Sequence, residues 1–257
     1  MLALISPAKK LHGSSTNTDH TFTQPLFSNH TLELTKILQK LSTPQLKDLM
    51  KLSDKLADLN VGRFKIFSKK PTEENARQAI FLFAGDTYQG LKAETFGEKN
   101  LDFAQEHLLI LSGLYGLLRP LDLIQPHRLE MGTKLQTPRG KSLYDFWGSS
   151  LINFCIEHVK AHKNPSLIFL GSNEYIKALG PLKEMSIPSI TCHFKECRNS
   201  ELKTIGLFAK KARGMMARFM IQNRLESPED LKGFREEGYA FRSDLSTETD
   251  FIFARSS

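Results

Sequence analysis

Long hydrophobic runs are absent from this 257-residue sequence, and so is the arrangement of a secretion signal. No stretch of about 18 consecutive apolar residues occurs, which excludes a membrane-spanning helix. Near the amino terminus, Lys9 and Lys10 follow a short apolar run, whereas the basic residues of a signal peptide precede it. We therefore expect residues 2–5 to form a buried strand, and we expect no membrane partner.

Cysteine is scarce, and the motifs of common metal and cofactor sites are missing. The three cysteines, Cys155, Cys192 and Cys197, are an odd number in a long chain, which predicts reduced thiols in a cytoplasmic protein. His158 and His162 are four residues apart, but no glutamate follows His158 as it does in zinc proteases. No dinucleotide, Walker or Gly-x-Ser-x-Gly motif occurs. We expect no metal ion and no cofactor, and the sequence assigns no catalytic residue.

The residues that are present describe a globular protein with an excess of positive charge. The composition is 40% hydrophobic and 25% charged, and the net charge is +7. No repeat or change in composition divides the chain, so we predict a single domain over residues 1–257. Apolar runs predict strands at 2–5, 79–83, 108–111, 166–170 and 187–194. Helical spacing predicts helices at 32–41, 44–52, 54–64 and 207–225, after a polar surface segment at 12–31. The fold class is therefore α+β (mixed α/β), with a mixed sheet flanked by helices.

The positive charge is concentrated in the predicted helix 207–225. Residues 202–225 contain no acidic residue. At about 100° per residue, five cations fall within an arc of about 160°: Lys210, Lys211, Arg213, Arg218 and Arg224. Phe208, Met215 and Phe219 lie opposite, so we expect one face to pack on the core and the other to face a phosphate backbone. A solvated or internally paired face and a membrane surface are the alternatives.

A second basic segment connects the helices predicted at 44–52 and 54–64. It has the spacing of a helix-hairpin-helix element (residues 44–64), whose glycines let backbone N–H groups approach a DNA phosphate. Lys51 and Ser53 occupy the glycine positions. Phosphate contact would therefore come from side chains, and the candidates are Lys51, Lys55, Arg63 and Lys65. An ordinary helical corner capped by Ser53 is the alternative.

Polar residues also follow the predicted strands. Because strand ends gather binding sites in open sheets, we expect an anion or ligand cleft. Its candidate residues are Ser6, Lys9, Tyr88, Ser112, Tyr115, Arg119, Arg128 and Glu130.

Several ordered strings resemble the bacterial peroxide-stress protein YaaA family across essentially the whole chain. They are ISPAK (5–9), SDKLA (53–57), LSGLYG (111–116), LRPLD (118–122), QP (125–126), RLEMG (128–132), LY (143–144), FWG (146–148), AKKARG (209–214), Phe234 and EGY (237–239). The resemblance implies a cytosolic protein of the hydrogen peroxide response that limits damage from unincorporated iron. It also implies a single-domain mixed α/β fold and binding of duplex or distorted DNA in a positively charged cleft, through a helix-hairpin-helix-like element at 44–64 and the basic helix at 209–224.

Two functions follow as hypotheses. The first is a DNA-binding stress-protection protein that contacts phosphates with little reading of bases, through Lys51, Lys55, Arg63, Lys65, Lys210, Lys211, Arg213 and Arg218. The alternative is an enzyme that acts on a nucleotide or another phosphorylated small molecule in the strand-end cleft. Because no reaction is indicated, a non-enzymatic role is favoured. No segment of the sequence points to a protein partner.

Overall fold

The computed structural model describes residues 1–13, 21–181, 186–198 and 201–256. Its strands are β1 (Leu2–Ile5), β2 (Lys10–Leu11), β3 (Arg77–Gln78), β4 (Phe83–Ala84), β5 (Leu108–Ser112), β6 (Gly116–Leu118), β7 (Leu123–Ile124), β8 (Leu167–Leu170), β9 (Ser189–Arg198), β10 (Glu201–Lys203), β11 (Ala240–Phe241) and β12 (Asp250–Ser256). Its α-helices are α1 (Ser28–Leu38), α2 (Thr43–Met50), α3 (Asp54–Lys65), α4 (Ala79–Leu82), α5 (Asp86–Leu91), α6 (Glu98–His107), α7 (Leu143–Trp147), α8 (Ser150–Val159), α9 (Asn173–Ile176) and α10 (Gly206–Gln222). Short 3₁₀ turns include η4 (Pro228–Gly233) and η5 (Glu236–Gly238).

The core of the molecule is a mixed sheet of eight strands in the order β11-β12-β9-β8-β1-β5-β6, with β10 paired to β9. The strands β5, β1, β8, β9 and β12 run parallel, while β6, β10 and β11 pair antiparallel with their neighbours. Every residue of β1, β5 and β8 is buried. Burial on both faces explains why these strands read as uninterrupted apolar runs, and the mixed sheet confirms the predicted mixed α/β fold.

Helix α10 packs between the sheet and helix α5, and two glycines allow the helices to touch. A Cβ atom added at Gly214 would lie 1.8 Å from the Thr87 carbonyl oxygen, and one at Gly90 would lie 2.1 Å from that of Lys211. The backbones of α5 and α10 are therefore in direct contact. Since α5 and α10 both border the cleft described below, this contact sets its width.

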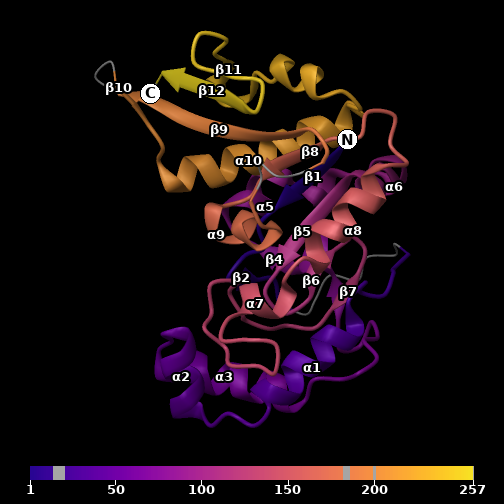
Figure 1. Ribbon diagram of the computed structural model, residues 1–257, viewed down its shortest axis with the longest axis vertical. Helices are drawn as coiled ribbons and strands as arrows, with labels where there is room; N and C mark the ends of the chain where they lie inside the picture. The colour runs from indigo at the N-terminus through magenta and orange to yellow at the C-terminus, as the bar shows by residue number, and fades with distance from the viewer. Residues whose placement is uncertain (14–20, 182–185, 199–200, 257) are drawn as a thin grey trace.

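Helices α2 and α3 form a hairpin at the end of the molecule opposite α10 (Figure 1). The backbone N–H of Ser42 donates to Gln45 Oε1 at 2.8 Å in a capping box at the start of α2. Lys51 ends α2 in the left-handed region, with φ of 51°, and Ser53 precedes α3 in an extended conformation. The two predicted helices are confirmed, but the hairpin and the basic helix lie far apart.

Two predictions about local structure differ from what is observed. Residues 79–82 form a helical turn and not a strand. The N–H groups of Ala79 and Ile80, which have no partner inside the turn, donate to the carbonyl oxygens of Asp122 and Pro120. In the predicted polar segment, residues 14–20 lie outside the described part of the chain, and α1 already begins at Ser28. Among the helices described, none has the length and apolar character needed to cross a membrane.

Candidate functional site

A cleft of about 390 Å³ opens where the carboxyl ends of β1, β5 and β8 meet. Strand β1 leads to Ser6, β5 ends at Ser112, and β8 leads to Ser172, and all three serines line the cleft. The backbone N–H of Ser172 donates to Ser6 Oγ at 2.8 Å. In Figure 1, α9 and α5 lie just below α10, and β4 and β2 lie below them. The structure thus brings the polar ends of these strands together in one cleft.

The position of the cleft in the sheet follows from the strand order. From β1 the chain continues to β5 on one side of β1, and then crosses to β8 on the other side. Such a reversal leaves a crevice outside the carboxyl ends of the two diverging strands, here β1 and β8. The hydrogen bond between Ser6 and Ser172 joins these two ends.

The mouth of the cleft carries paired and unpaired charges. Lys9 and Arg128 both contact the carboxylate of Glu130, at 2.6 Å and 3.0 Å. Lys10 and Lys210 also line the cleft, and neither has an ion-pair partner among the described residues. The cleft therefore presents positive charge that the described residues leave uncompensated.

Arg213 is the most unusual of these cations. It projects into the cleft from α10, and its Nε atom is buried without a hydrogen-bond partner in the described part of the chain. No carboxylate of the described ranges forms an ion pair with it either. Burial lowers the pKa of the guanidinium, although not enough for an arginine to lose its proton. A buried polar atom without a partner is unfavourable, so this position favours an anion from outside the described structure.

His127 closes the cleft from the side of the loop that follows β7. Its Nδ1 lies 2.9 Å from the Gln125 carbonyl oxygen, so the neutral ring donates from Nδ1. Its ring contacts those of Phe83 and Tyr115 edge-on. Burial lowers the pKa of His127 to about 4, so the imidazole is uncharged at neutral pH.

Five of the eight residues predicted for the strand-end cleft line it: Ser6, Lys9, Ser112, Arg128 and Glu130. The other three do not. Tyr88 lies behind the wall, where its hydroxyl donates to the Ser6 carbonyl oxygen, and the Tyr115 hydroxyl accepts from the Gln125 N–H. Arg119 is held at 2.9 Å from the buried carboxylate of Asp122.

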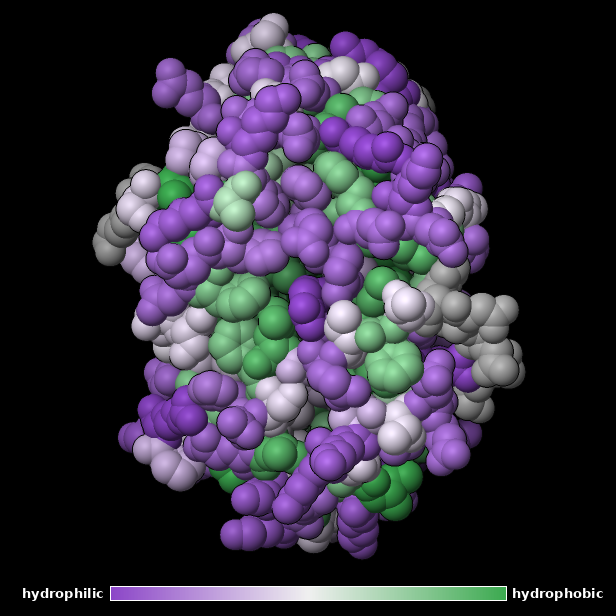
Figure 2. Space-filling view, turned by 90° about the vertical axis from the view of Figure 1, so that its right-hand side faces the viewer, coloured by the Kyte–Doolittle hydropathy of each residue, from purple (hydrophilic) through white to green (hydrophobic). Residues whose placement is uncertain are grey.

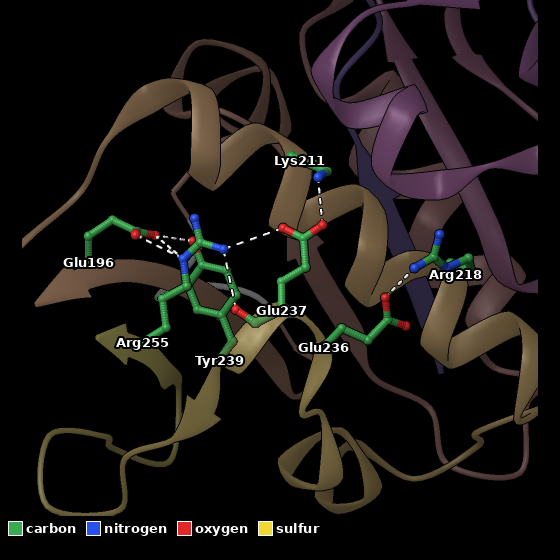
Figure 3. Close-up of polar contacts among 7 residues, drawn as sticks. All are labelled: Glu196, Lys211, Arg218, Glu236, Glu237, Tyr239 and Arg255. Carbon is green, nitrogen blue, oxygen red and sulfur yellow. Dashed lines mark hydrogen bonds and ion pairs between the residues drawn. The ribbon is translucent and has the colours of Figure 1, made fainter. Parts of the chain in front are cut away.

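The basic helix divides its cations between three environments. Lys210 and Arg213 enter the cleft, whereas Lys211 pairs with Glu237 at 2.5 Å and Arg218 pairs with Glu236. Figure 3 shows both glutamates reaching α10 from the η5 turn. Arg224 is exposed beyond the end of α10. The expectation of a single free cationic face is therefore wrong for Lys211 and Arg218, because η5 supplies two acids.

The same turn belongs to a larger network that fixes α10 to the sheet. Arg255 Nε donates to Glu196 Oε2 at 2.8 Å, and its Nη1 lies 3.3 Å from a carboxylate oxygen of Glu237. Tyr239 donates its hydroxyl to Glu196, which is 1% exposed. Figure 3 shows how these side chains meet between β9, β12 and η5. The network holds the acids of η5 in place, so pairing of Lys211 and Arg218 is built into the fold.

The cations of the hairpin lie on a surface separate from the cleft. Lys51, Lys55 and Lys65 are exposed and have no ion-pair partner among the described residues, whereas Lys47 pairs with Asp54 at 2.7 Å. Arg63 lines a second cavity of about 400 Å³, and burial lowers its pKa. The structure thus shows two surfaces that carry unpaired cations, one on the hairpin, where Asp48 and Asp58 are also exposed, and one at the cleft. We call them the two cationic surfaces.

The face of the molecule seen in Figure 2 is mostly hydrophilic near its upper end. Apolar side chains gather at mid-height on this face, where hydrophilic side chains interrupt them.

The comparison with protein families identifies the chain. A family model described as Peroxide stress protein YaaA matches residues 1–245. The chain belongs to the peroxide stress protein YaaA family. This result confirms the resemblance carried by the ordered strings, and it is consistent with a part in the response to oxidative stress.

Some residues that line the cleft of this YaaA-family chain are not predicted by the sequence. Lys10, His127 and Tyr175 are missed, and Arg213 is predicted as a DNA contact of the basic helix and not as a residue of the cleft. Lys10 stands next to Lys9, His127 next to Arg128, and Tyr175 follows the turn after β8. No motif marks these positions. Their proximity in the sequence to predicted residues is the signal that could have found them.

Membership of the YaaA family raises the question of whether the cysteines react with peroxide. No group of three or more His, Cys, Asp and Glu residues in the described part of the chain is arranged to hold a metal ion. Cys155 and Cys192 are buried, and burial raises the pKa of both thiols to about 12. Since the thiolate is the reactive form, these two thiols are poorly reactive in the folded protein.

We expect hydrogen peroxide to leave Cys155 and Cys192 unmodified in the native protein and to oxidise both in guanidinium. Peptide mass spectrometry after timed exposure measures the difference. Oxidation of either residue at the same rate in native and unfolded protein would show that burial does not protect it.

Proposed function

We propose that the protein acts in the peroxide-stress response by binding the phosphates of duplex or distorted DNA. Family membership supports the stress response. The observation that supports phosphate binding is that exposed lysines on both cationic surfaces lack acidic partners among the described residues, namely Lys51, Lys55 and Lys65 on the hairpin and Lys210 on α10. Such side chains can neutralise phosphates without first breaking an ion pair.

The proposed contacts are not equivalent. Lys51, Lys55 and Lys65 project from the hairpin, where Lys51 replaces the backbone approach of a glycine by a side-chain contact. Lys211 and Arg218 contact DNA only if they leave Glu237 and Glu236. Arg63 and Arg213 lie in cavities. The primary contacts are therefore the unpaired, exposed lysines, and we expect base reading to be minor because phosphate contacts carry no sequence information directly.

The biological part of the proposal is a cytoplasmic protein that limits damage from unincorporated iron. DNA is a target of iron-dependent oxidation, and a protein that covers its phosphates would keep cationic iron from the same groups. The described ranges of the chain include no residue cluster that would sequester iron directly. The route that we propose is protection by occupying DNA phosphates.

We expect Lys51→Ala combined with Lys55→Ala to reduce DNA affinity and to lower the slope of log affinity against log salt by about 2, because each phosphate contact contributes about 1. Fluorescence anisotropy with labelled duplexes of unrelated sequence, at several salt concentrations, measures both quantities. Lys210→Ala tests the second surface in the same way.

Lys211→Ala is the matched control, because Lys211 lies next to Lys210 but is paired with Glu237. We expect it to change the slope little. A wild-type affinity that is independent of salt would refute phosphate binding, and a loss restricted to one DNA sequence would refute the minor role of base reading.

A further inference from the structure

We propose that the cleft at the carboxyl ends of β1 and β8 binds a small organic phosphate, a monoester of about nucleotide size, with Arg213 as its counter-ion. This ligand is distinct from DNA, so the inference goes beyond the proposed function. It unites residues that the sequence places in two separate sites. Ser6 and Ser172 come from the strand ends, and Lys210 and Arg213 come from the basic helix.

The shape and position of the cleft suit a small organic molecule. Its volume of about 390 Å³ is within the range of small-molecule sites, which is about 300–1,000 Å³. It lies at the point where the strand order reverses, and open parallel sheets bind ligands there. Phe83, Leu129, Leu170 and Tyr175 contribute to its walls. The cleft thus offers an apolar wall for an organic body beside a cationic group.

Arg213 lacks a partner inside the described structure. Its Nε atom is inaccessible to solvent and makes no hydrogen bond within the described ranges. The cations of α10 that face η5 are paired, Lys211 with Glu237 and Arg218 with Glu236. Proteins pair buried charges or use them to bind a ligand. A guanidinium held in a cleft is suited to bidentate contact with phosphate oxygens.

The charges that line the cleft indicate the charge of the ligand. Arg213, Lys10 and Lys210 have no ion-pair partners among the described residues, whereas Lys9 and Arg128 already share Glu130. The cleft is also lined by two further acids, Asp86 and Glu174, so the site is not uniformly cationic. Five cations and three acids line the cleft, so its formal charge is +2. This balance favours a group of nearly two negative charges, which a phosphate monoester carries at neutral pH and a single carboxylate does not.

The position of Arg213 also separates this ligand from a DNA duplex. A double helix is too wide to enter a cleft of about 390 Å³, so its phosphates reach only the mouth, where Lys10 and Lys210 lie. Arg213 is only partly exposed and its Nε atom is buried, so a small molecule can reach the guanidinium more readily than a duplex can. Loss of the Arg213 charge is therefore expected to weaken binding of the monoester alone, whereas Lys210 contributes to both kinds of binding.

Thermal denaturation and calorimetry of the full chain with inorganic phosphate, ribose 5-phosphate and adenosine 5′-monophosphate test the proposal. We expect at least one monoester at 100 times its Kd to raise the Tm by about 5–10 °C. Organic monoesters should bind more tightly than inorganic phosphate, because the apolar wall contacts only the former. Equal affinities, or the absence of a shift with every probe, would overturn the proposal.

Arg213→Met removes the charge and keeps most of the stem. We expect it to weaken monoester binding at least tenfold, while the Tm without ligand stays the same or rises. Lys211→Met, the ion-paired neighbour, is the control and should bind like wild type. Wild-type binding by Arg213→Met would overturn the assignment. Should that variant fail to fold, Arg213→Lys and Lys210→Met test the site, and unchanged binding in both would overturn it.

The two proposals fail separately. Loss of the salt-dependent DNA affinity with a retained monoester shift refutes DNA binding and leaves the cleft ligand in place. If the salt-dependent DNA affinity persists and no monoester raises the Tm, the cleft ligand is refuted and DNA binding stands.

Discussion

Gly214→Ala is expected to lower the free energy of unfolding by about 3 kcal/mol, at the upper end of the usual cost of overpacking. The added Cβ would lie 1.8 Å from the carbonyl oxygen of Thr87 and 2.8 Å from the backbone nitrogen of Leu91. Both atoms belong to the backbone of α5, so no rotation of a side chain relieves the clash. Helix α10 must move away from α5. Urea denaturation followed by circular dichroism measures the loss.

The same substitution should also impair the cleft, because Thr87 lines it from α5 and Arg213 from α10. Gly90→Ala should behave alike, since its Cβ would meet the Lys211 carbonyl oxygen at 2.1 Å. Gly62→Ala is the matched control: Gly62 lies inside α3, and a Cβ added there would meet no atom within 4 Å. It should gain about 0.5–1 kcal/mol. Equal stabilities of Gly214→Ala and Gly62→Ala would contradict the described contact between α5 and α10.

The free energy of unfolding is expected to fall by about 3 kcal/mol between pH 7.5 and pH 4 through His127 alone. Burial lowers the pKa of His127 to about 4 in the folded protein, against an ordinary value of 6.5 in the unfolded chain. Between these two pKa values, His127 is protonated in the unfolded chain but not in the folded chain. The resulting loss of stability begins as the pH falls below about 6.5 and is nearly complete at pH 4. His162, whose pKa burial also lowers to about 4, adds to the same trend.

His127→Gln isolates the contribution, because glutamine keeps an N–H donor for the Gln125 carbonyl oxygen but does not titrate. At pH 7.5 the variant should be less stable, having lost the ring contacts with Phe83 and Tyr115. Its stability should depend less steeply on pH, by about 3 kcal/mol between pH 7.5 and pH 4. The exposed His12→Asn serves as control. Parallel pH profiles for wild type and His127→Gln would show that His127 does not titrate in this way.

Local patterns in the sequence are sufficient to predict the elements that depend on neighbours along the chain. Ser42 and Pro44 mark the start of α2, Ser53 marks the start of α3, and the apolar runs mark β1, β5 and β8. The exception is the turn at 79–82. Its first two N–H groups donate to the carbonyl oxygens of Asp122 and Pro120, and nothing near Ala79 in the sequence predicts these distant contacts.

For a similar reason, the sequence predicts that a polar cleft lies at the strand ends but does not predict all the residues that line it. Angular position on α10 can be calculated from the sequence, but the acids that pair with Lys211 and Arg218 come from η5. Likewise, Arg213 and Ser6 belong to one cleft only because α10 packs across the end of β1. Interactions between distant segments decide which cations are free, and a single sequence does not contain that information.

The central place of β1 in the sheet has a consequence for how the protein acquires its structure. Ala3 of β1 pairs with Leu108 of β5, and Leu2 pairs with Leu167 of β8. During synthesis, the apolar segment of β1 therefore stays unpaired until β5 and β8 have been made. Closing the long loops that join β1 to these strands is also slow. Until then an uncovered hydrophobic strand is available to chaperones or to other nascent chains. The yield of folded protein should thus respond to the speed of translation and to the supply of chaperones before the emergence of β8.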